Sequence, residues 1–476
     1  MPDTNPVTQT LAHWVAQLPY ETLPAAVIQQ AKRVVVDYLG ECVFVGGTKP
    51  WGQNIAAFAA KDGGGQPEAT IISTGKKTLA SRAALANGTM ALGFELADVL
   101  PKANVRPYPM AVTPALALAE ARGRSGKTLL ASIVVAYDVI NRVSTAISPQ
   151  RRQTLLGRGI YPPSLIGTFG AAASAGKAIG LTPQQMTYAL GIAGAFTGGY
   201  FQGHEEGAWT RSLNGGMACE RGVTAALLAE SGFTAPLRGL EGESGFYKTF
   251  AEGEFDEAAL IGGLGESFVI SDTWLKGYPM NATLHSPVEA LLHIMRTHRL
   301  SHTDIEQIDA AWHMYVKVLG KHDIRTVVSA QASLPFCLAV ASVRGKITVD
   351  EFTDATVGDP VVQAMMSRIQ VQYDPELFQR VKGESLPGRV TVRTKDDREF
   401  THEVLYPKGN PKNPMTDAEF HGKFLGLTEP VLGRLQSEEL YQRAMEMETV
   451  PNVSAFAALF SPRQSPAGAG NPRRAV

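Results

Sequence analysis

Residues 87–99 read NGTMALGFELADV, and residues 110–147 follow with long Ala, Leu and Val runs that one Gly-rich break interrupts. Upstream, apolar residues recur at i, i+3, i+4 and i+7 across residues 27–39, which predicts a helix with one apolar face. Downstream, residues 164–200 hold two apolar segments rich in Ala and Gly and poor in charge. Helices of that composition are buried on most sides, so the sequence predicts a helical bundle over residues 8–250.

The boundary between the two apolar segments carries a helix-start signal. Thr182 stands where an N-cap is expected, Pro183 takes the first helical position, and Gln185 lies three residues after the cap. This order is typical of a capping box, in which the side chains at both ends satisfy free backbone N–H groups. The sequence therefore predicts a new helix from Pro183.

After about residue 270 the hydrophobic period changes from that of helices to that of strands. Alternation of apolar and polar residues predicts strands at 308–316, 369–373, 389–393 and 399–404. The last two are joined by a charged turn at 395–398, which predicts a hairpin. Helical patterns lie between the strands, at 286–298 and 329–344. We therefore expect a mostly α protein with a smaller α+β part.

The same changes predict the domain organisation. We expect a helical domain built from residues 1–270 and 412–460, an α+β domain at 271–411 inserted into it, and a disordered tail at 461–476. The tail is rich in Pro, Gly, Ala and Arg and has no hydrophobic pattern of a core segment.

Charge, cysteine spacing and the lack of targeting signals argue against several kinds of partner and compartment. The net charge of −1 gives no bulk attraction to nucleic acid or to an anionic membrane. Cys42, Cys219 and Cys337 share no close spacing, which argues against a disulfide framework or a zinc site. Without a secretory signal pattern or an apolar run of about 18 residues, we expect a cytoplasmic protein with no membrane span.

Residues 87–99, with Tyr108-Pro109 and the PALALAE of residues 114–120, resemble the signature of the MmgE/PrpD family. Later stretches agree in order and spacing, and the resemblance extends to about residue 445. It implies a large all-helical domain made of both chain ends, a smaller α+β lid, a cleft between them and a homodimer. It also implies removal of a proton next to a carboxylate, with loss of water or carbon dioxide and without metal or organic cofactor.

The chain departs from the family where histidines are expected. Leu92 stands at the first family His, Ala97 replaces one Asp, and Tyr108 takes the place of the His before a proline. Between His13 and His204 the chain has no His at all. The resemblance thus implies a divergent member that lacks most family histidines.

Four residues of the N-terminal half are candidates for proton transfer. Tyr108 and Tyr161 each stand at a family His-Pro position, and a phenol can donate a proton to an enolate. Asp98 matches a retained family Asp, but it also fits an N-cap or an ion pair with Arg106 or Lys102. Glu95 precedes Asp98 by three residues, so the two would share a face if the helix continued, and paired carboxylates raise one pKa. A solvated helix end is the alternative for Glu95, with equal weight.

Candidate substrate-binding residues follow further along the chain. Arg211 replaces a family Lys and Asn214 a family His in residues 210–216, TRSLNGG. Because Arg grips carboxylates through two parallel donors, Arg211 predicts carboxylate binding, with a structural salt bridge as the alternative. Arg106 is a further candidate cation. His204 and the two glutamates after it fit a His–Glu pair that acts as a general base or, with more weight, a mobile acidic loop.

Residues 276–285, KGYPMNATLH, resemble the family lid motif. Lys276 is expected to face the cleft, Asn281 matches the first motif His, and His285 matches the second. His285 is thus the retained family histidine, either as a base or as the cap of the helix near residue 287. Tyr315 is a candidate lid tyrosine.

Two functions remain open from the sequence. One is a cofactor-independent lyase or isomerase for a small carboxylate or polycarboxylate, with rewritten proton-transfer groups. The loss of histidines argues against ordinary 2-methylcitrate dehydration or cis-aconitate decarboxylation. The other is a non-catalytic relative that binds a small acid or serves as a dimeric structural partner. Polar replacements at the pocket positions favour the enzyme. No Rossmann fingerprint, zinc set or GxSxG motif is present.

Overall fold

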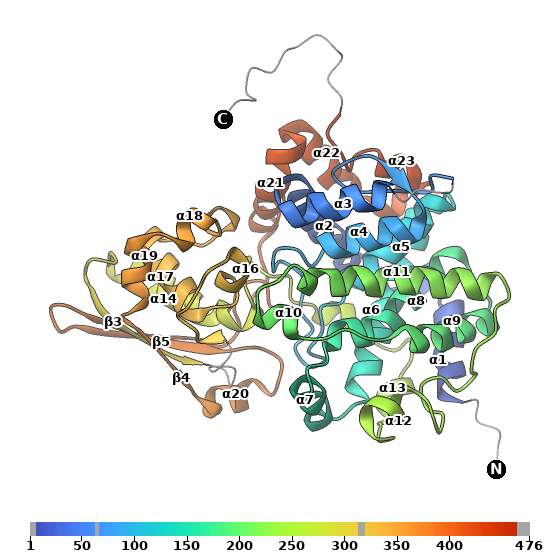
Figure 1. Cartoon of the computed structure of the whole chain (residues 1–476), viewed down its shortest axis with the longest axis horizontal. Helices are drawn as coiled ribbons and strands as arrows, with labels where there is room; N and C mark the ends of the chain where they lie inside the picture. The colour runs from blue at the N-terminus through green and yellow to red at the C-terminus, as the bar shows by residue number, and fades with distance from the viewer. Residues whose placement is uncertain (1–5, 62–65, 313–318, 464–476) are drawn as a thin grey trace, which may run out of the picture.

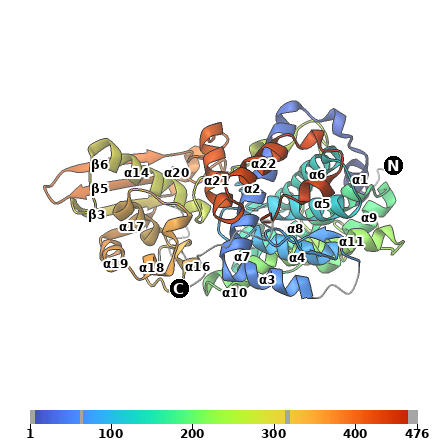
Figure 2. The same cartoon turned by 90° about the horizontal axis from the view of Figure 1, so that it is seen from above.

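The computed structural model describes residues 6–61, 66–312 and 319–463. Two parts lie side by side, a larger helical part and a smaller part that contains a sheet (Figures 1 and 2). The first and the last described segments, α1 (Val7–Gln17) and α23 (Val453–Ala457), both lie in the helical part. The mostly α fold with a small α+β insertion, expected from the sequence, is confirmed.

The first part of the chain supplies most of the helical part. Its helices are α1 (Val7–Gln17), α2 (Ala25–Thr48), α3 (Pro50–Lys61), α4 (Ala80–Met90), α5 (Tyr108–Ala121), α6 (Gly126–Thr145), α7 (Pro149–Gly157), α8 (Pro162–Ile179), α9 (Pro183–Phe196), α10 (Gln202–Glu205), α11 (Thr210–Glu230), α12 (Phe246–Ala251) and α13 (Glu257–Ile261). Short 3-10 helices η1 (Tyr20–Thr22) and η2 (Val269–Asp272) and a small hairpin of β1 (Ala69–Thr70) and β2 (Lys77–Thr78) accompany them.

Helix α8 lies at the centre of this bundle and packs against α5, α6, α9 and α11. Small residues permit the close approach, since a Cβ on Gly222 of α11 would lie 2.3 Å from the Cβ of Ala171 in α8. The predicted capping box at the start of α9 is confirmed: Thr182 accepts from the N–H of Gln185, and the Gln185 side chain accepts from the N–H of Thr182.

The C-terminal helices return to the N-terminal ones. They are α21 (Asp417–Leu432), α22 (Arg434–Met445), η5 (Met447–Thr449) and α23 (Val453–Ala457). Both α21 and α22 pack on α2, where Arg33 pairs with Asp417 at 2.8 Å and Lys32 with Glu448 at 2.9 Å. Both ends of the chain therefore build the helical part. The exact boundaries at residues 270 and 411 stay a prediction, and residues 464–476 of the predicted tail lie outside the described residues.

The inserted part contains a four-stranded sheet of order β4-β3-β5-β6. Its strands are β3 (Ile305–Trp312), β4 (Ile369–Tyr373), β5 (Gly388–Thr394) and β6 (Glu399–Val404). The β3–β4 pair is parallel, with Ile308 opposite Ile369, and the other two pairs are antiparallel. The predicted hairpin of β5 and β6 is confirmed.

Helices of the inserted part accompany this sheet. They are η3 (Ala282–Leu284), α14 (His285–His298), α16 (Val327–Ala330), α17 (Leu334–Arg344), η4 (Val349–Glu351), α18 (Asp354–Val357), α19 (Pro360–Met366) and α20 (Pro375–Val381). Helix α14 packs on β5 and β6, and α17 on β4 and α14. Buried and more exposed residues alternate along β5, as expected for a sheet with one covered face.

Two predicted elements have different bounds. The strand expected at 308–316 is described to Trp312, and its remainder, with Tyr315, lies outside the described residues. The single helix expected at 329–344 is two helices, α16 and α17. Ser333 caps α17 by accepting from the N–H of Phe336, and the carbonyl of Gln331 accepts from the N–H of Asn281 instead of continuing a helix.

Within the described ranges, no single helix is long and apolar enough to cross a membrane, and one bent pair, α6 with α7, meets the length and composition test when taken together.

Candidate active site

A cavity of about 800 Å³ lies between the helical part and the inserted part. The helical part contributes charged and aromatic side chains to its wall, among them Glu95, Arg106, Tyr161, His204 and Arg211. The inserted part contributes neutral polar side chains, among them Asn281, Thr283, Ser329 and Ser333. The wall thus combines cations, a phenol, an imidazole and neutral hydrogen-bonding groups, the functional groups expected around a small polar ligand.

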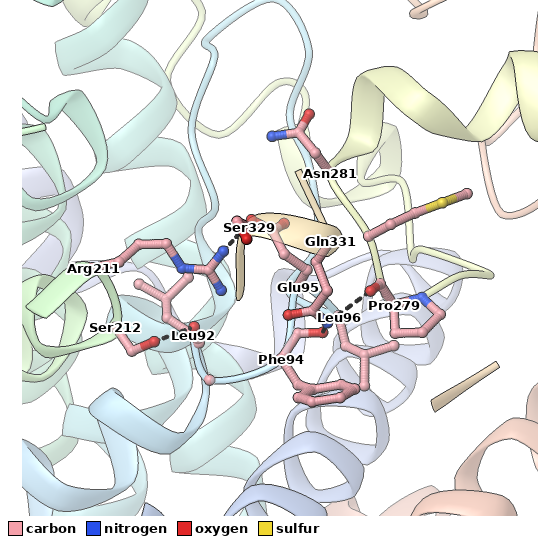
Figure 3. Close-up of polar contacts among 12 residues, drawn as sticks. Leu92, Phe94, Glu95, Leu96, Arg211, Ser212, Pro279, Asn281, Ser329 and Gln331 are labelled. Carbon is pink, nitrogen blue, oxygen red and sulfur yellow. Dashed lines mark hydrogen bonds and ion pairs between the residues drawn. The ribbon is translucent and has the colours of Figure 1, made fainter. Parts of the chain in front are cut away.

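Glu95 joins two cations at the helical end of the cavity. Its carboxylate accepts from Arg211 Nη1 at 2.8 Å (Figure 3) and from Lys276 Nζ at 3.0 Å. Arg211 is near the start of α11, and Lys276 lies in the segment that leads into the inserted part. Burial works to raise the pKa of Glu95, but the charges of Lys276 and Arg211 outweigh it and hold the pKa well below the usual value.

The backbone around Glu95 is held from both sides. Glu95 has a φ of 57°, in the left-handed region that few side chains adopt. The Glu41 carboxylate accepts from the N–H of Phe94 at 2.7 Å, and Gln331 of the inserted part donates to the carbonyls of Phe94 and Pro279 (Figure 3). A strained residue clamped in this way beside a cavity suggests a functional constraint.

The expected pairing of Glu95 with Asp98 is wrong. Helix α4 ends at Met90, so the two residues do not share a helical face. Asp98 instead accepts from the backbone N–H of Tyr108 at the start of α5, at 2.9 Å, and from the Tyr137 hydroxyl at 2.6 Å. It is fully buried, outside the cavity wall, and burial raises its pKa to about 7. Asp98 therefore holds the start of α5 from a distance, and the N-cap of that helix is Pro107 instead of Asp98.

Tyr108 lies behind the cavity wall and not in it. Its ring is fully buried, and its hydroxyl donates to the second oxygen of Glu41. Burial raises the pKa of Glu41 to about 7, despite the hydrogen bonds from Tyr108 and the Phe94 N–H. Tyr108 therefore holds Glu41, which in turn holds the backbone beside Glu95. The predicted catalytic role of Tyr108 stays a prediction.

Tyr161 and His204 form an aromatic cluster in the wall. Their ring centroids lie 4.6 Å apart, and Phe201 stacks on His204 at 4.7 Å and lies 6.3 Å from Tyr161. Burial raises the pKa of Tyr161 to about 12, while burial and the nearby Arg211 lower the pKa of His204 to about 3. His204 Nδ1 is buried and has no hydrogen-bond partner within the described ranges. The residue lines the cavity, but this nitrogen itself has no exposed surface.

The acidic loop expected around His204 is instead a short helix. Residues 202–205 form α10, which packs on α11 and presents His204 to the cavity. Tyr161 lies more than one helix away along the chain, so no local pattern predicts its contact with His204. The one available signal is that His204 precedes the Arg211 segment by a few residues.

Arg106 leaves most of its donors without a described partner. Its Nη1 donates at 3.3 Å to the carbonyl of Val105, and no described carboxylate lies within ion-pair distance of it. The positive charge of Arg106 helps to lower the pKa values of Glu95, Tyr161 and His204, which places Arg106 in the same cluster.

The remaining candidates divide between wall and interior. Asn281 lines the cavity and caps η3, accepting from the N–H of Thr283. Asn214 lies outside the wall and donates to the carbonyl of Tyr200 at 3.3 Å. Lys276 is expected to face the cleft but has no exposed surface, because it is covered behind Glu95 and also donates to the carbonyl of Met280 at 3.1 Å. Burial lowers the pKa of Lys276 to about 8.

His285 is buried inside the inserted part, away from the cavity wall. It is the first residue of α14, packed edge-on against Trp274 and Tyr278, with Nε2 3.2 Å from the carbonyl of Met280. Burial and the charge of Lys276 hold its pKa well below the usual value. The role of His285 as a base stays a prediction.

No group of three or more His, Cys, Asp or Glu side chains that could hold a metal ion occurs in the part of the chain that the structure describes. The three cysteines are buried and unpaired with one another.

Comparison with known proteins gives matches over almost the whole chain. The MmgE/PrpD N-terminal domain matches residues 9–258, and the MmgE/PrpD C-terminal domain matches residues 278–447. The cis-aconitate decarboxylase of Aspergillus terreus is 25% identical over 97% of both chains. The human cis-aconitate decarboxylase is 24% identical over 98% of this chain and 96% of its own. The cis-aconitate decarboxylase-like protein oryM of Aspergillus oryzae is 25% identical over 97% of this chain and 98% of its own.

Proposed function

The chain belongs to the MmgE/PrpD family, and from that premise we propose that it is a cofactor-independent lyase acting on a small carboxylate. Relatives named cis-aconitate decarboxylase, at 24–25% identity, support lyase chemistry of the family's kind. Isomerisation would use the same proton transfer without loss of a group, and it is a variant of the same proposal.

The observation that carries this proposal is the convergence of Arg106, Tyr161 and His204 on one cavity between the two parts of the molecule. Proton transfer next to a carboxylate needs a cation to hold that carboxylate and a group that can accept or donate the proton. A cavity that served only packing would have no use for a cation with free donors beside an unpartnered imidazole nitrogen.

We assign the carboxylate to Arg106 and the proton to the Tyr161–His204 pair. In an elimination, the pair removes the proton from the carbon next to the carboxylate. The hydroxyl group on the neighbouring carbon then takes up a proton and leaves as water. In a decarboxylation, carbon dioxide leaves and the same pair delivers a proton to the carbon left behind. Both routes pass through a carbanion that nearby cations stabilise.

Substrate binding would adjust His204 for this task. Burial and the charges of Arg211 and Arg106 hold His204 neutral, with a pKa of about 3. A bound carboxylate offsets part of that positive charge and raises the imidazole pKa, which makes His204 a stronger base when substrate is present.

Solvent exchange in D₂O tests the proposal whatever the product is. The protein is incubated with malate, 3-hydroxybutanoate and cis-aconitate and followed by proton NMR. We expect loss of the signal of a hydrogen next to a carboxylate, or new olefinic signals, for at least one compound. Tyr161→Phe and His204→Gln should each lower the rate by about 100-fold or more. The matched controls Tyr200→Phe and His421→Gln, both outside the cavity wall, should keep it.

The second candidate is a relative that binds a carboxylate without turnover. The burial of Tyr108 and His285 away from the cavity favours it, because two expected proton-transfer groups do not line the wall. Binding of a carboxylate by calorimetry, with neither exchange nor product in D₂O, would establish this second function and rule out the lyase.

A further inference from the structure

We propose that Glu95 sets how many carboxylates the cavity accepts, and that the substrate carries one carboxylate together with neutral polar groups. The inference rests on the proposed function, since it takes the cavity between the two parts as the substrate site. It concerns the substrate class, which neither the family nor its reaction type decides.

Glu95 already occupies the position of a bound carboxylate. One oxygen accepts from Arg211 and the other from Lys276, the two cations that would otherwise face an anionic ligand together. The side chain is 12% exposed and its cationic partners 5% and 0%, so water screens these contacts weakly. A second carboxylate brought to the same cations would lie beside Glu95 and be repelled by it.

A ligand cannot easily displace Glu95, because its backbone is fixed independently of its side chain. Glu41 accepts from the N–H groups of Phe94 and Leu96, at 2.7 and 3.4 Å, on either side of Glu95. Gln331 donates to the carbonyl of Phe94 at 2.9 Å. These bonds keep Glu95 at its φ of 57° and its carboxylate directed at the two cations.

The charged side chains of the wall, taken together with Lys276 behind it, leave one cation in surplus. Among the described residues, equal numbers of cationic and carboxylate side chains line the cavity: Arg106, Arg211, Lys321 and Arg325 against Glu95, Glu205, Glu206 and Asp323. Arg325 pairs with Asp323 at 2.9 Å, as Arg211 does with Glu95. Lys276, behind Glu95, adds the surplus charge. One carboxylate restores neutrality, and a second would exceed it.

Arg106 is the natural ligand for that single carboxylate, because its guanidinium donates to one backbone carbonyl and pairs with no described carboxylate. Across the cavity, Asn281, Thr283, Ser329 and Ser333 offer amide and hydroxyl groups. Such groups suit hydroxyl or carbonyl substituents and do not neutralise a second negative charge.

Butanoate and succinate form a matched pair of probes, since succinate replaces the terminal methyl of butanoate by a carboxylate. Their dissociation constants would be measured by isothermal titration calorimetry at pH 7.5 on the full chain. We expect wild type to bind butanoate about tenfold or more tighter than succinate. Two carboxylates this close shift a pKa by about one unit or more, and the same repulsion free energy corresponds to about tenfold in affinity.

Glu95→Gln removes the internal carboxylate and keeps its shape. It should tighten succinate by about tenfold relative to butanoate. The double variant Glu95→Gln/Lys276→Met removes one charge of each sign and should restore the wild-type preference. Glu266→Gln, an exposed carboxylate outside the cavity wall, is the matched control and should leave the preference within about twofold. If Glu95→Gln does not fold, Lys276→Met alone, which keeps the Glu95–Arg211 pair, should weaken butanoate by about tenfold.

The outcomes separate the inference from the proposed function. Tighter binding of succinate than of butanoate by wild type would overturn the inference and leave the lyase proposal standing. So would a folded Glu95→Gln with an unchanged preference, or Lys276→Met with unchanged butanoate affinity. Binding of neither probe, nor of malate or cis-aconitate, at millimolar concentration would overturn the proposed function, and the inference with it.

Discussion

Two arginines of the helical part line the cavity, and what each already binds separates their roles. Arg211 is 5% exposed and pairs with Glu95, whereas Arg106 is only partly buried and donates to one backbone carbonyl. An arginine held by a buried carboxylate supports the structure as well as any ligand, while one with free donors serves a ligand first.

Conservative substitution should therefore affect the two arginines differently. Arg106→Lys loses the bidentate grip on a substrate carboxylate, so we expect the dissociation constant of butanoate to rise by one to two decades with little change in melting temperature. Arg211→Lys loses the fitted contact with Glu95 inside the protein, and we expect it to lower the melting temperature. Calorimetry and thermal denaturation of both variants measure this. The reverse pattern would return the carboxylate to Arg211.

Glu41 makes stability depend on pH in a defined direction. Burial raises its folded-state pKa to about 7 from an ordinary value of 4.5, so the folded protein favours the protonated carboxyl. A raised pKa gives stability that is present below about pH 4.5 and lost as pH rises through about 7.

Glu41→Gln keeps hydrogen-bonding groups for Phe94 and Tyr108 but cannot ionise. From pH 4.5 to 8 we expect its unfolding free energy to improve relative to wild type by up to roughly 3 kcal/mol, since one pKa unit corresponds to about 1.4 kcal/mol. Urea denaturation across this range measures the difference. The same trend in Glu266→Gln, or none in Glu41→Gln, would contradict the assignment of this pH dependence to Glu41.

At the scale of elements, the ends of helices place the site. Helix α4 stops at Met90, which frees residues 91–98 to cross under the cavity, and α5 starts at Tyr108, with Asp98 accepting its N–H. Helix α11 starts at Thr210, so that Arg211 lies in its first turn. The cavity wall is built from segments between helices together with helical residues such as His204 of α10 and Arg211 of α11.

The capping box of α9 is a local device that can be tested by itself. Thr182→Ala removes the oxygen that accepts from the N–H of Gln185, and we expect the unfolding free energy to fall by about 1 kcal/mol. Thr224→Ala, in the middle of α11, removes a hydroxyl that bonds only the preceding turn and should cost less. Chemical denaturation of the two variants side by side checks this. Equal losses would mean that α9 is held by packing alone.

At the scale of the whole molecule, the inserted part is attached to the helical part at the site itself. Gln331 bonds the carbonyl of Phe94, Lys276 pairs with Glu95, and the Phe352 ring packs edge-on against Phe94. The segment around Phe94 thus joins both parts, so that their relative position and the shape of the cavity depend on the same few contacts.

Assembly as a homodimer stays a proposal, drawn from the Ala- and Gly-rich helices and the family resemblance. Large apolar side chains on the helical part are left about half exposed or more, among them Phe58 at 49%, Tyr200 at 62% and Trp209 at 49%. We expect light scattering at micromolar concentration to give about twice the chain mass of 51.0 kDa. Trp209→Lys should shift the mass toward the monomer, whereas Leu435→Lys on α22 should not. A wild-type mass near that of one chain would refute the dimer.

Features that depend on neighbours in sequence could be predicted from the sequence. The helix from residue 25, the capping box at Thr182 and the β5–β6 hairpin all follow from local period and cap chemistry, and all are present. The family could be identified for the same reason, because its markers keep their order and spacing along the chain. Arg106, Tyr161, Arg211 and Asn281 are also candidates from the sequence, and all four line the cavity.

Features that depend on distant neighbours were decided only by the tertiary structure. Glu95 lies 116 residues from Arg211 and 181 from Lys276, and no local pattern shows that the three charges meet. The same packing turned Tyr108 and His285 inward and brought His204 to the cavity wall. The sequence alone does not show whether a polar residue lies in the core or in a pocket. Its pKa, its partners and its availability to a ligand come from burial and nearby charge, which exist only once the chain has folded.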